Sequence, residues 1–348
     1  IHRILPNGPA EKSKKIKVND RIIAVGQSNQ PPVDVVDMSL NKAVQLIRGP
    51  KGTEVRLTIM PAGADSSARK EITLVRDEIK LEDQEAKAKI IELPNVRGGE
   101  TRLGVIDLPS FYASFDPSNS REKAEPKSTT ADVARLLNKF KSENVNGVVL
   151  DLRRNGGGSL EEAIRLTGLF IKDGPVVQVR DYDNHVEEDD DPDPSILYDG
   201  PLIVLTSRLS ASASEILAWA LQDYGRALIV GDSSTHGKGT VQSVQQLHIR
   251  GSSLLTNVNP GALKLTIKKF YRPSGASTQL KGVVPDIVLP SLFSESKEIG
   301  ETALDHALKW DTIPKAKYDH LELVDPYLQE LRKRSTERVA SDKEFSYI

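Results

Sequence analysis

The sequence predicts an α/β core that follows a small β-rich module and precedes a short helical extension. Three observations support this prediction. From about residue 78 to residue 300, apolar runs of strand length alternate with amphipathic stretches of helical length, as in an α/β fold. Residues 1–77 hold short strands and a single amphipathic helix, whereas residues 301–348 are polar and contain helical sequence. We therefore expect three domains, 1–77, 78–300 and 301–348.

Glycine and proline turns divide the first module into short elements. We expect four strands, at 1–5, 20–26, 55–59 and 72–75. The run 55–59 alternates apolar and polar residues in the manner of a strand, and the run 20–26 ends in glycine. Gly8 and Pro9 begin a helical turn, and the stretch 37–47 carries its leucine, valine and isoleucine at helical spacing.

The core alternates strands and helices in chain order. We expect strands at 103–108, 147–152, 202–205 and 227–230. We expect helices at 131–140, 160–170 and 213–224, and Gly225 stands where the last of them needs a C-terminal cap. Two polar stretches, 115–130 and the acidic run 187–194, are expected to be loops. Beyond the core, residues 327–339 have the composition of a polar helix.

The composition excludes several classes of protein. The chain has 348 residues, and its 47 basic and 49 acidic side chains nearly cancel, so nothing indicates a nucleic-acid partner or an anionic membrane. The absence of cysteine excludes disulfides and thiolate chemistry and suits an oxidising compartment. No apolar run is long enough to span a membrane, and no segment resembles a signal peptide. Because the sequence opens at Ile1 rather than at methionine, we expect it to be a fragment.

Three serines stand at the start of the apolar helix 213–224. Ser210, Ser212 and Ser214 alternate with alanines ahead of Glu215. One hypothesis makes one of them a nucleophile, since the free amides and positive end of a helix N-terminus stabilise an oxyanion. The alternative is structural, because Ser212 and Glu215 have the spacing of a capping box.

Lys238 lies in a glycine-flanked turn after the strand 227–230. The turn is not a phosphate-binding P-loop, because five residues separate Gly231 from Gly237 and because glycine follows the lysine. Lys238 is therefore either an exposed surface lysine or a general base. A base requires a pKa lowered from about 10.4 to about 7, which means destabilising the ammonium by roughly 4 to 5 kcal/mol. Gln242, two strand steps further on the same face, could accept a hydrogen bond from the amine without adding charge.

A histidine offers a different base. His236 is two residues from Lys238 and could form a triad with Ser212 and either Asp223 or Asp232. The sequence around the serines is not the GxSxG turn of a serine esterase. This absence does not support a His-based esterase, which we keep as an alternative together with an inert peptide-binding scaffold.

Two sets of segments in the chain resemble known protein families. GPAEKSKKIKVNDRIIAVG (8–26) and GPKGTEVRLTI (49–59) resemble a PDZ domain, whose carboxylate-binding loop is not found before Ile1, so we expect this domain to be incomplete at its N-terminus. VVLDLRRNGGG, SASASEILAWALQDYGRALIVG, GKGTVQ, KLTIKKFYRPSGASTQLKGVVPDI and LKWDTI follow one another in the order found in bacterial tail-specific proteases, also called carboxyl-terminal processing peptidases. This order of matches is highly specific and runs through most of the chain.

The resemblance to tail-specific proteases implies a serine/lysine dyad. It assigns the nucleophile to Ser212, the general base to Lys238, and the residue that orients the lysine to Gln242. The interval from Ser212 to Lys238 is 26 residues, one more than is usual in the family. Asp223 matches an aspartate of the family pattern, for which we infer no role.

The resemblance also implies the rest of the site and its setting. The oxyanion would be held by the Ala213 amide and by the amide of Gly157 or Gly158. The core would be a crotonase-like serine protease fold that uses no cofactor and no metal. Its partners would be protein or peptide substrates with accessible C-terminal tails, and an adaptor protein is a further expected partner. The location would be the bacterial periplasm or the periplasmic face of a membrane.

Overall fold

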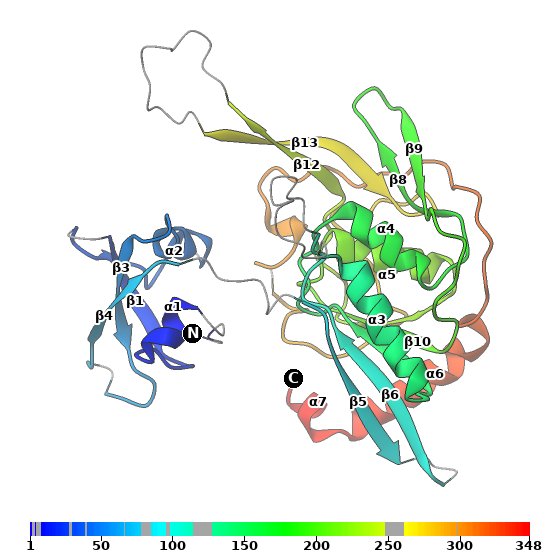
Figure 1. Cartoon of the computed structure of the whole chain (residues 1–348), viewed down its shortest axis with the longest axis horizontal. Coiled ribbons are helices and arrows are strands. Elements are labelled where there is room, and N and C mark those ends of the chain that lie inside the picture. The colour runs from blue at the N-terminus through cyan, green and yellow to red at the C-terminus, as the bar shows by residue number, and fades with distance from the viewer. Residues whose placement is uncertain are drawn as a thin grey trace, which may run out of the picture. The chain divides into compact units, whose positions relative to one another are not determined.

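The described residues form two units, each with its own apolar core. The computed structural model describes residues 1, 4, 8–27, 30–38, 40–65, 67–77, 85–94, 98–113, 127–247, 261–296 and 298–348. The two units are Ile1–Asp83 and Gln84–Ile348 (Figure 1). Most of the predicted strand 1–5 and most of the predicted loop 115–130 lie outside the described residues.

A four-stranded antiparallel sheet in the order β2-β1-β3-β4 forms the first unit together with two short helices. Its elements are α1 (Pro9–Ser13), β1 (Arg21–Gln27), β2 (Val33–Asp34), α2 (Leu40–Ile47), β3 (Glu54–Met60) and β4 (Lys70–Val75). In β3, Val55, Leu57 and Ile59 are buried and the residues between them are not, as the alternating sequence predicts. Strand β2 was not predicted, because two residues are too short to show a period.

A six-stranded sheet in the order β14-β11-β10-β7-β6-β5 organises the second unit. Its strands are β5 (Lys87–Pro94), β6 (Glu100–Asp107), β7 (Gly147–Asp151), β10 (Leu202–Thr206), β11 (Leu228–Gly231) and β14 (Ile287–Val288). All neighbours are parallel except β5, which pairs antiparallel with β6. Strand β5 was not predicted, because its sequence KAKIIELP does not alternate cleanly and the strand is largely exposed.

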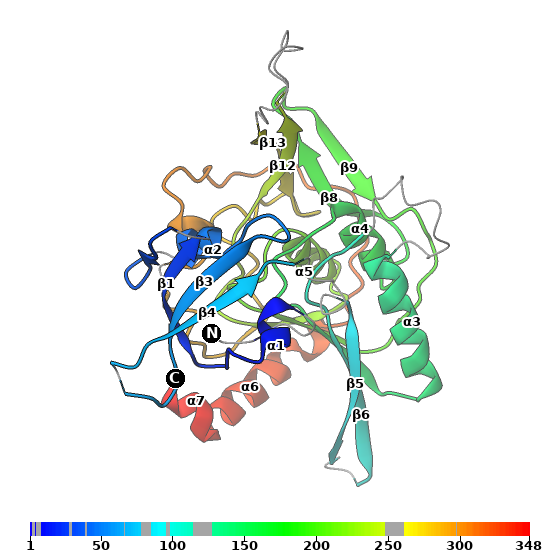
Figure 2. The same ribbon diagram turned by 60° about the vertical axis from the view of Figure 1, so that its left-hand side comes forward.

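Three helices pack against one face of this sheet (Figures 1 and 2). They are α3 (Thr129–Ser142), α4 (Leu160–Gly168) and α5 (Ala213–Asp223). In β7, Val148 and Leu150 are buried beneath these helices, whereas Val149 on the opposite face is half-buried. Because the strands are parallel, the loops that follow β7, β10 and β11 meet at one edge of the sheet.

A second, four-stranded antiparallel sheet has the order β12-β13-β8-β9. It contains β8 (Pro175–Arg180), β9 (Val186–Asp190), β12 (Thr240–Gln246) and β13 (Ala262–Tyr271). The prediction that the acidic run 187–194 is a loop was wrong over its first half, which lies in β9. Those acidic residues are tolerated because β9 is an exposed edge strand, where Glu187 pairs with Lys268 at 2.9 Å.

The C-terminal segment returns to the core before it ends in helices. The 3-10 helix η2 (Glu301–Ala303) is followed by α6 (Asp325–Ser341) and α7 (Lys343–Tyr347). Between them, the Trp310 indole N–H donates to the Ser277 carbonyl at 2.8 Å, which ties this segment to the core. The predicted fold class, an α/β core with a β-rich first domain and a C-terminal helix, is confirmed. Among the described helices, none combines the length and apolarity needed to cross a membrane.

Candidate active site

The loops after β7, β10 and β11 enclose a small cavity at the carboxyl edge of the core sheet. Its volume is ≈ 260 Å³, and its wall is completed by the hairpin of β12 and β13. Residues of its lining include Gly158, Ser212, Ala213, Lys238, Gln242 and Lys264. Of the six residues predicted for the site, five therefore line one cavity, although they lie up to 84 positions apart in the sequence, and Gly157 is the exception.

Ser212 is the one serine of the three that lines the cavity. The Ser210 hydroxyl is fully buried, donates to the Leu152 carbonyl at 2.7 Å and accepts from a backbone amide at 2.9 Å. The Ser214 hydroxyl is also fully buried and donates to the Asn155 carbonyl at 2.8 Å. Both side chains thus bind the helix N-terminus to neighbouring loops, whereas Ser212 is partly accessible.

The backbone of Ser212 does not have the conformation of an ordinary helix cap. Its φ of 58° and ψ of −115° lie outside the extended region that an N-cap residue normally adopts. Non-glycine residues rarely have such angles, and those that do cluster at functional sites. The capping-box hypothesis is right about Glu215, whose carboxylate accepts from the Ser212 amide at 2.8 Å.

Glu215 connects the serine turn to the lysine loop. Its two carboxylate oxygens accept from four groups: the amides of Ser212, Gly237 and Lys238 at 2.8, 2.7 and 3.1 Å, and the Thr235 hydroxyl at 2.5 Å. The side chain is fully buried, and this burial raises its pKa to about 7, against the opposing effect of the four donors. One carboxylate thereby fixes the backbone of both Ser212 and Lys238.

Two of the three residues whose amides were predicted as oxyanion donors, Ala213 and Gly158, line the cavity. Neither amide donates a hydrogen bond within the described part of the chain, and both residues line the cavity. The Gly157 amide, the other predicted donor, is not available, because it already donates to Asn155 Oδ1 at 2.8 Å. Of the two glycines predicted to supply the second oxyanion donor, Gly158 is therefore the one whose amide has no partner among the described residues.

Gly157 has a different requirement, close approach to the serine turn. A Cβ atom there would lie 2.7 Å from the Ala211 carbonyl oxygen and 2.9 Å from Ser212 Cβ. Its φ of +101° is also one that residues with side chains rarely adopt. Glycine at this position thus allows the loop after β7 to contact the turn that carries Ser212.

The surroundings of Lys238 favour its neutral form. Burial lowers the pKa of its amine, and the positive charge of Lys264 on β13 lowers it further, while Glu301 and Glu215 oppose both effects. No hydrogen bond among the described residues joins the Ser212 hydroxyl to the Lys238 amine. The two side chains line one cavity without a hydrogen bond between them in the described structure.

Gln242 reaches the cavity by a different route from the one predicted. Strand β12 begins at Thr240, after Lys238, and bulges between Val241 and Gln242. Strand alternation therefore does not place Lys238 and Gln242 on one face, and the prediction was wrong in that step. Both residues nevertheless line the same cavity, and no hydrogen bond between them is present among the described residues.

The alternative histidine triad is not formed. Asp223 lies at the far end of α5, where it binds Arg272 and the Ser274 amide. The Asp232 carboxylate accepts from the Arg208 amide at 2.8 Å. His236 faces neither of them; its Nδ1 lies 3.8 Å from a Glu301 oxygen, and burial lowers its pKa. The geometry therefore does not favour a His-based esterase.

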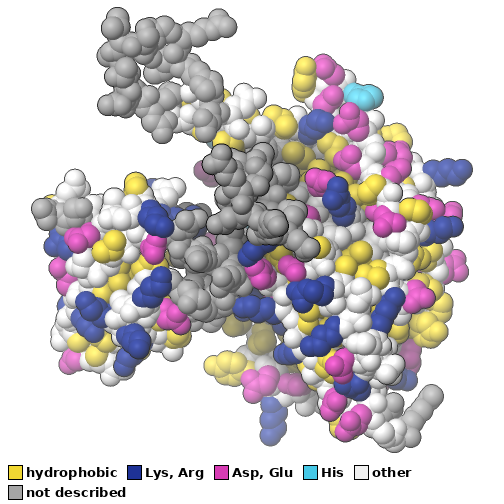
Figure 3. All heavy atoms as spheres, in the orientation of Figure 1, with side chains coloured by type: hydrophobic (Ala, Val, Ile, Leu, Met, Phe, Trp, Pro, Cys, Tyr) yellow, Lys and Arg dark blue, Asp and Glu magenta, His cyan; other side chains and the backbone are white. Residues whose placement is uncertain are grey.

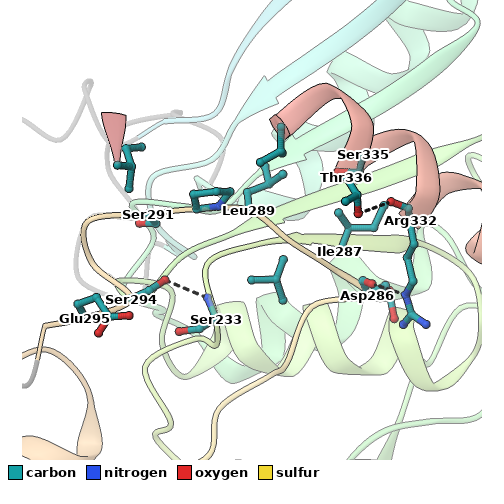
Figure 4. A pocket seen from close by; sticks show the side chains of 14 residues that line it. Ser233, Asp286, Ile287, Leu289, Ser291, Ser294, Glu295, Arg332, Ser335 and Thr336 are labelled. Atoms are coloured by element: carbon teal, nitrogen blue, oxygen red, sulfur yellow. Dashed lines mark hydrogen bonds between the residues drawn. The ribbon is translucent and has the colours of Figure 1, made fainter. Parts of the chain in front are cut away.

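A larger cavity of ≈ 690 Å³ lies elsewhere, between the segment after β14 and α6 (Figure 4). At one side of it Arg332 Nε donates to the Asp286 carbonyl at 2.8 Å, and the Ser233 amide donates to the Ser294 hydroxyl at 3.3 Å. None of the predicted catalytic side chains lines it.

Within the described residues no group of three or more histidine, aspartate or glutamate side chains could hold a metal ion. Basic and acidic side chains are interspersed on the surface seen in Figure 3.

Comparison with known proteins identifies the family. The sequence model of peptidase family S41 matches residues 102–289, more than half of the chain. The chain belongs to peptidase family S41. Two further family models match it: the PDZ domain at residues 1–60 and the C-terminal domain of tail specific protease at residues 294–348. The resemblance to bacterial tail-specific proteases is thereby confirmed.

Individual relatives agree with that family assignment. The chain is 43% identical over 348 residues to the tail-specific protease of Haemophilus influenzae, covering 99% of this chain and 46% of that protein. It is 35% identical to the carboxy-terminal-processing protease of Bartonella bacilliformis, covering 78% and 56%. Among solved structures, the photosystem II D1 C-terminal processing protease matches with a TM-score of 0.54 and 26% identity, covering 83% of this chain and 67% of that chain. The chain spans about half the length of these curated relatives.

Three polar residues at or near the candidate site were not predicted from sequence. Glu215 was identified only as a cap, since its other partners come from a loop 20 or more positions away. Lys264 comes from β13, whose pairing with β12 places it at the cavity. Glu301 belongs to the C-terminal segment and faces the lysine loop from outside. Only the capping-box spacing of Glu215 carried a local signal.

Proposed function

We propose that this S41 chain is part of a serine endopeptidase that binds the C-terminal tail of protein substrates through its PDZ domain and cleaves them by a Ser-Lys acyl-enzyme mechanism. The observation that carries the proposal is the shared cavity, which brings Ser212 and Lys238 together at a helix N-terminus. Lowering of the Lys238 pKa by burial supports its role as a base.

In this mechanism the neutral Lys238 amine removes the proton of the Ser212 hydroxyl as its oxygen attacks the scissile carbonyl carbon. The tetrahedral oxyanion accepts hydrogen bonds from the Ala213 and Gly158 amides, which are otherwise unbonded in the described structure. The lysine ammonium then protonates the departing amine, which leaves the acyl group on Ser212. Water attacks the acyl group with Lys238 again as base. The lysine ammonium then returns this proton to the Ser212 oxygen as its bond to the acyl carbon breaks and the new carboxyl terminus is released.

Gln242 would orient the lysine. Its amide oxygen can accept a hydrogen bond from one N–H of the Lys238 amine, and a neutral acceptor does not raise the lysine pKa as a carboxylate would. The two side chains line the same cavity, which supports this role. Assembly of the Ser212, Lys238 and Gln242 contacts on substrate binding would convert the unbonded arrangement into the reactive one.

The substrates would be proteins or peptides with accessible C-terminal tails. The match of a PDZ model to residues 1–60 supports tail recognition, and the relatives named above as processing proteases support cleavage. An adaptor protein that presents such substrates, and a location in the bacterial periplasm or at the periplasmic face of a membrane, are part of the same proposal.

Two peptides of one sequence test it, one with a free C-terminal carboxylate and one amidated. A form of the protein whose PDZ domain carries its carboxylate-binding loop should cleave the free peptide faster, because that loop binds the terminal carboxylate. Ser212→Ala and Lys238→Ala should abolish cleavage. A fluorophosphonate probe should label Ser212 in the parent and should label it far more slowly in Lys238→Ala. Unchanged cleavage by Ser212→Ala would refute the mechanism, and equal cleavage of the two peptides would refute tail recognition.

A further inference from the structure

The backbone of residues 236–239, which carries Lys238, is hydrogen-bonded at every N–H and C=O. Facing α5, the His236 amide donates to the Ser210 carbonyl, and the next two amides donate to Glu215. On the opposite side, three carbonyls accept from Phe270, Thr278 and Leu280. The backbone that carries the lysine is therefore held from two sides, by the segment 210–215 at the start of α5 and by the segment 270–280.

Glu301, in the C-terminal segment, also hydrogen-bonds to this backbone and to Gln279. Its amide donates to the His236 carbonyl at 2.8 Å, and its Oε1 accepts from Gln279 Nε2 at 3.0 Å. Gln279 Oε1 in turn accepts from the Gly239 amide at 2.8 Å. Glu301 thus holds the loop on both sides of Lys238, directly at residue 236 and through Gln279 at residue 239.

Both side chains are enclosed. Gln279 is fully buried and Glu301 is 7% exposed, so neither can replace a lost partner with bulk water. The segment before Glu301 is anchored as well, because the Arg208 guanidinium donates to the Ile299 carbonyl and to the Ser234 hydroxyl. Glu301 lies within residues 294–348, which match the C-terminal domain of tail-specific proteases rather than the S41 core.

We propose that Glu301 and Gln279 are positioning residues for the catalytic lysine, and that through them the C-terminal segment forms part of the active-site support. The inference rests on the proposed Ser-Lys mechanism. Glu301 touches neither the serine nor the cavity, and it acts on the backbone that presents Lys238. The chain's C-terminal segment would then be needed for activity as well as for stability.

The charge of Glu301 affects the pKa of Lys238, so the midpoint of the pH profile should change when this charge is removed. A residue that only stabilises the fold would not change that midpoint. Three charged groups act on the Lys238 amine besides its burial: Lys264 on β13 lowers its pKa, while Glu301 in η2 and Glu215 on α5 raise it. Glu301→Gln keeps an oxygen that accepts from Gln279 and removes the negative charge. Its pH profile should therefore move while its backbone support is kept.

The experiment measures the rate at which a fluorophosphonate probe labels Ser212 in the full chain, as a function of pH. Glu301→Leu, which removes the acceptor, should slow labelling about tenfold, as expected for loss of one buried hydrogen bond. Glu301→Gln should label at a rate closer to the parent, with the midpoint of its pH profile shifted to lower pH. Glu298→Gln, an exposed carboxylate of the same segment, is the matched control and should behave as the parent.

Parent-like labelling by folded Glu301→Leu, or an unshifted midpoint in Glu301→Gln, would overturn the inference. If circular dichroism shows that Glu301→Leu does not fold, the midpoint of Glu301→Gln decides alone. The proposed function is tested separately, because it requires labelling of the parent at Ser212 and its loss in Lys238→Ala. Parent-like Glu301 variants with that pattern intact would refute the positioning role and leave the mechanism standing.

Discussion

Replacing Glu215 by glutamine should uncouple the serine turn from the lysine loop. Four donors converge on the carboxylate: Thr235 and Gly237 on one oxygen, Ser212 and Lys238 on the other. Glutamine presents one oxygen and one NH2 group, so whichever way the amide points it opposes donor to donor at one of the two positions.

At least one buried backbone amide is then left without an acceptor. Such a group costs about 1–3 kcal/mol. If that cost falls on the positions of Ser212 and Lys238, the rate of fluorophosphonate labelling at Ser212 should drop about tenfold or more. The free energy of unfolding at neutral pH should change less, because glutamine also removes the penalty of burying a charge.

The pH dependence of stability has a defined sign. Burial raises the Glu215 pKa from 4.5 to about 7, so the folded protein binds this proton more tightly than the unfolded chain does. The stabilising contribution of neutral Glu215 is fully present below pH 4.5 and is lost as the pH rises through 7, a change of about 3 kcal/mol. Glu215→Gln lacks this titration, so the difference in free energy of unfolding between parent and variant should shift by that amount.

Urea denaturation at several pH values measures the stability, and probe labelling per folded molecule measures the site. Glu162→Gln is the matched control: Glu162 is another buried carboxylate, 5% exposed, that accepts from Ser128 and Thr130 outside the cavity. It should lose stability without losing labelling rate. Equal labelling by Glu215→Gln and the parent, or parallel pH curves of stability, would refute the reasoning.

Three further predictions concern the same region. Gly157→Ala should slow labelling of Ser212 at least tenfold, because its Cβ would lie 2.7 Å from a carbonyl oxygen of the serine turn. Gly156→Ala is the control and should label at the parent rate, because a Cβ at Gly156 meets nothing within 4 Å. Lys264→Gln should raise the pKa of Lys238 and move the labelling midpoint to higher pH; an unchanged midpoint would contradict this. Asp223→Asn should lower the free energy of unfolding in urea by about 1–3 kcal/mol without changing labelling per folded molecule, because its carboxylate binds Arg272 far from the cavity; a labelling defect would refute that structural role.

Elements with a clear hydrophobic period were predictable from the sequence, and elements shaped by pairing were not. Helix α5 and strand β7 are apolar and buried, so their composition alone indicated them. Strand β9 is acidic and takes its conformation from pairing with β8, which no local pattern reveals.

The same division applies to the candidate site. Ser212 and Lys238 stand in distinctive local sequence, a helix start and a glycine-flanked turn, so the sequence alone indicates both. The exclusion of the Gly157 amide depends on a hydrogen bond to Asn155, and the support of the lysine loop depends on Glu301, 63 positions away from Lys238. Contacts of these kinds are formed by tertiary packing, so spacing along the chain does not indicate them.

The pH dependence of Ser212 labelling in the parent and in Lys238→Ala tests the central claim most directly. If Lys238 is the general base, the parent rate should rise with pH around a single midpoint below 10.5, the ordinary value for lysine, since burial lowers the Lys238 pKa. Lys238→Ala should lose that rise and label on the order of a hundredfold more slowly, as expected for loss of a general base. A Lys238→Ala variant that labels at the parent rate with the same midpoint would contradict the account.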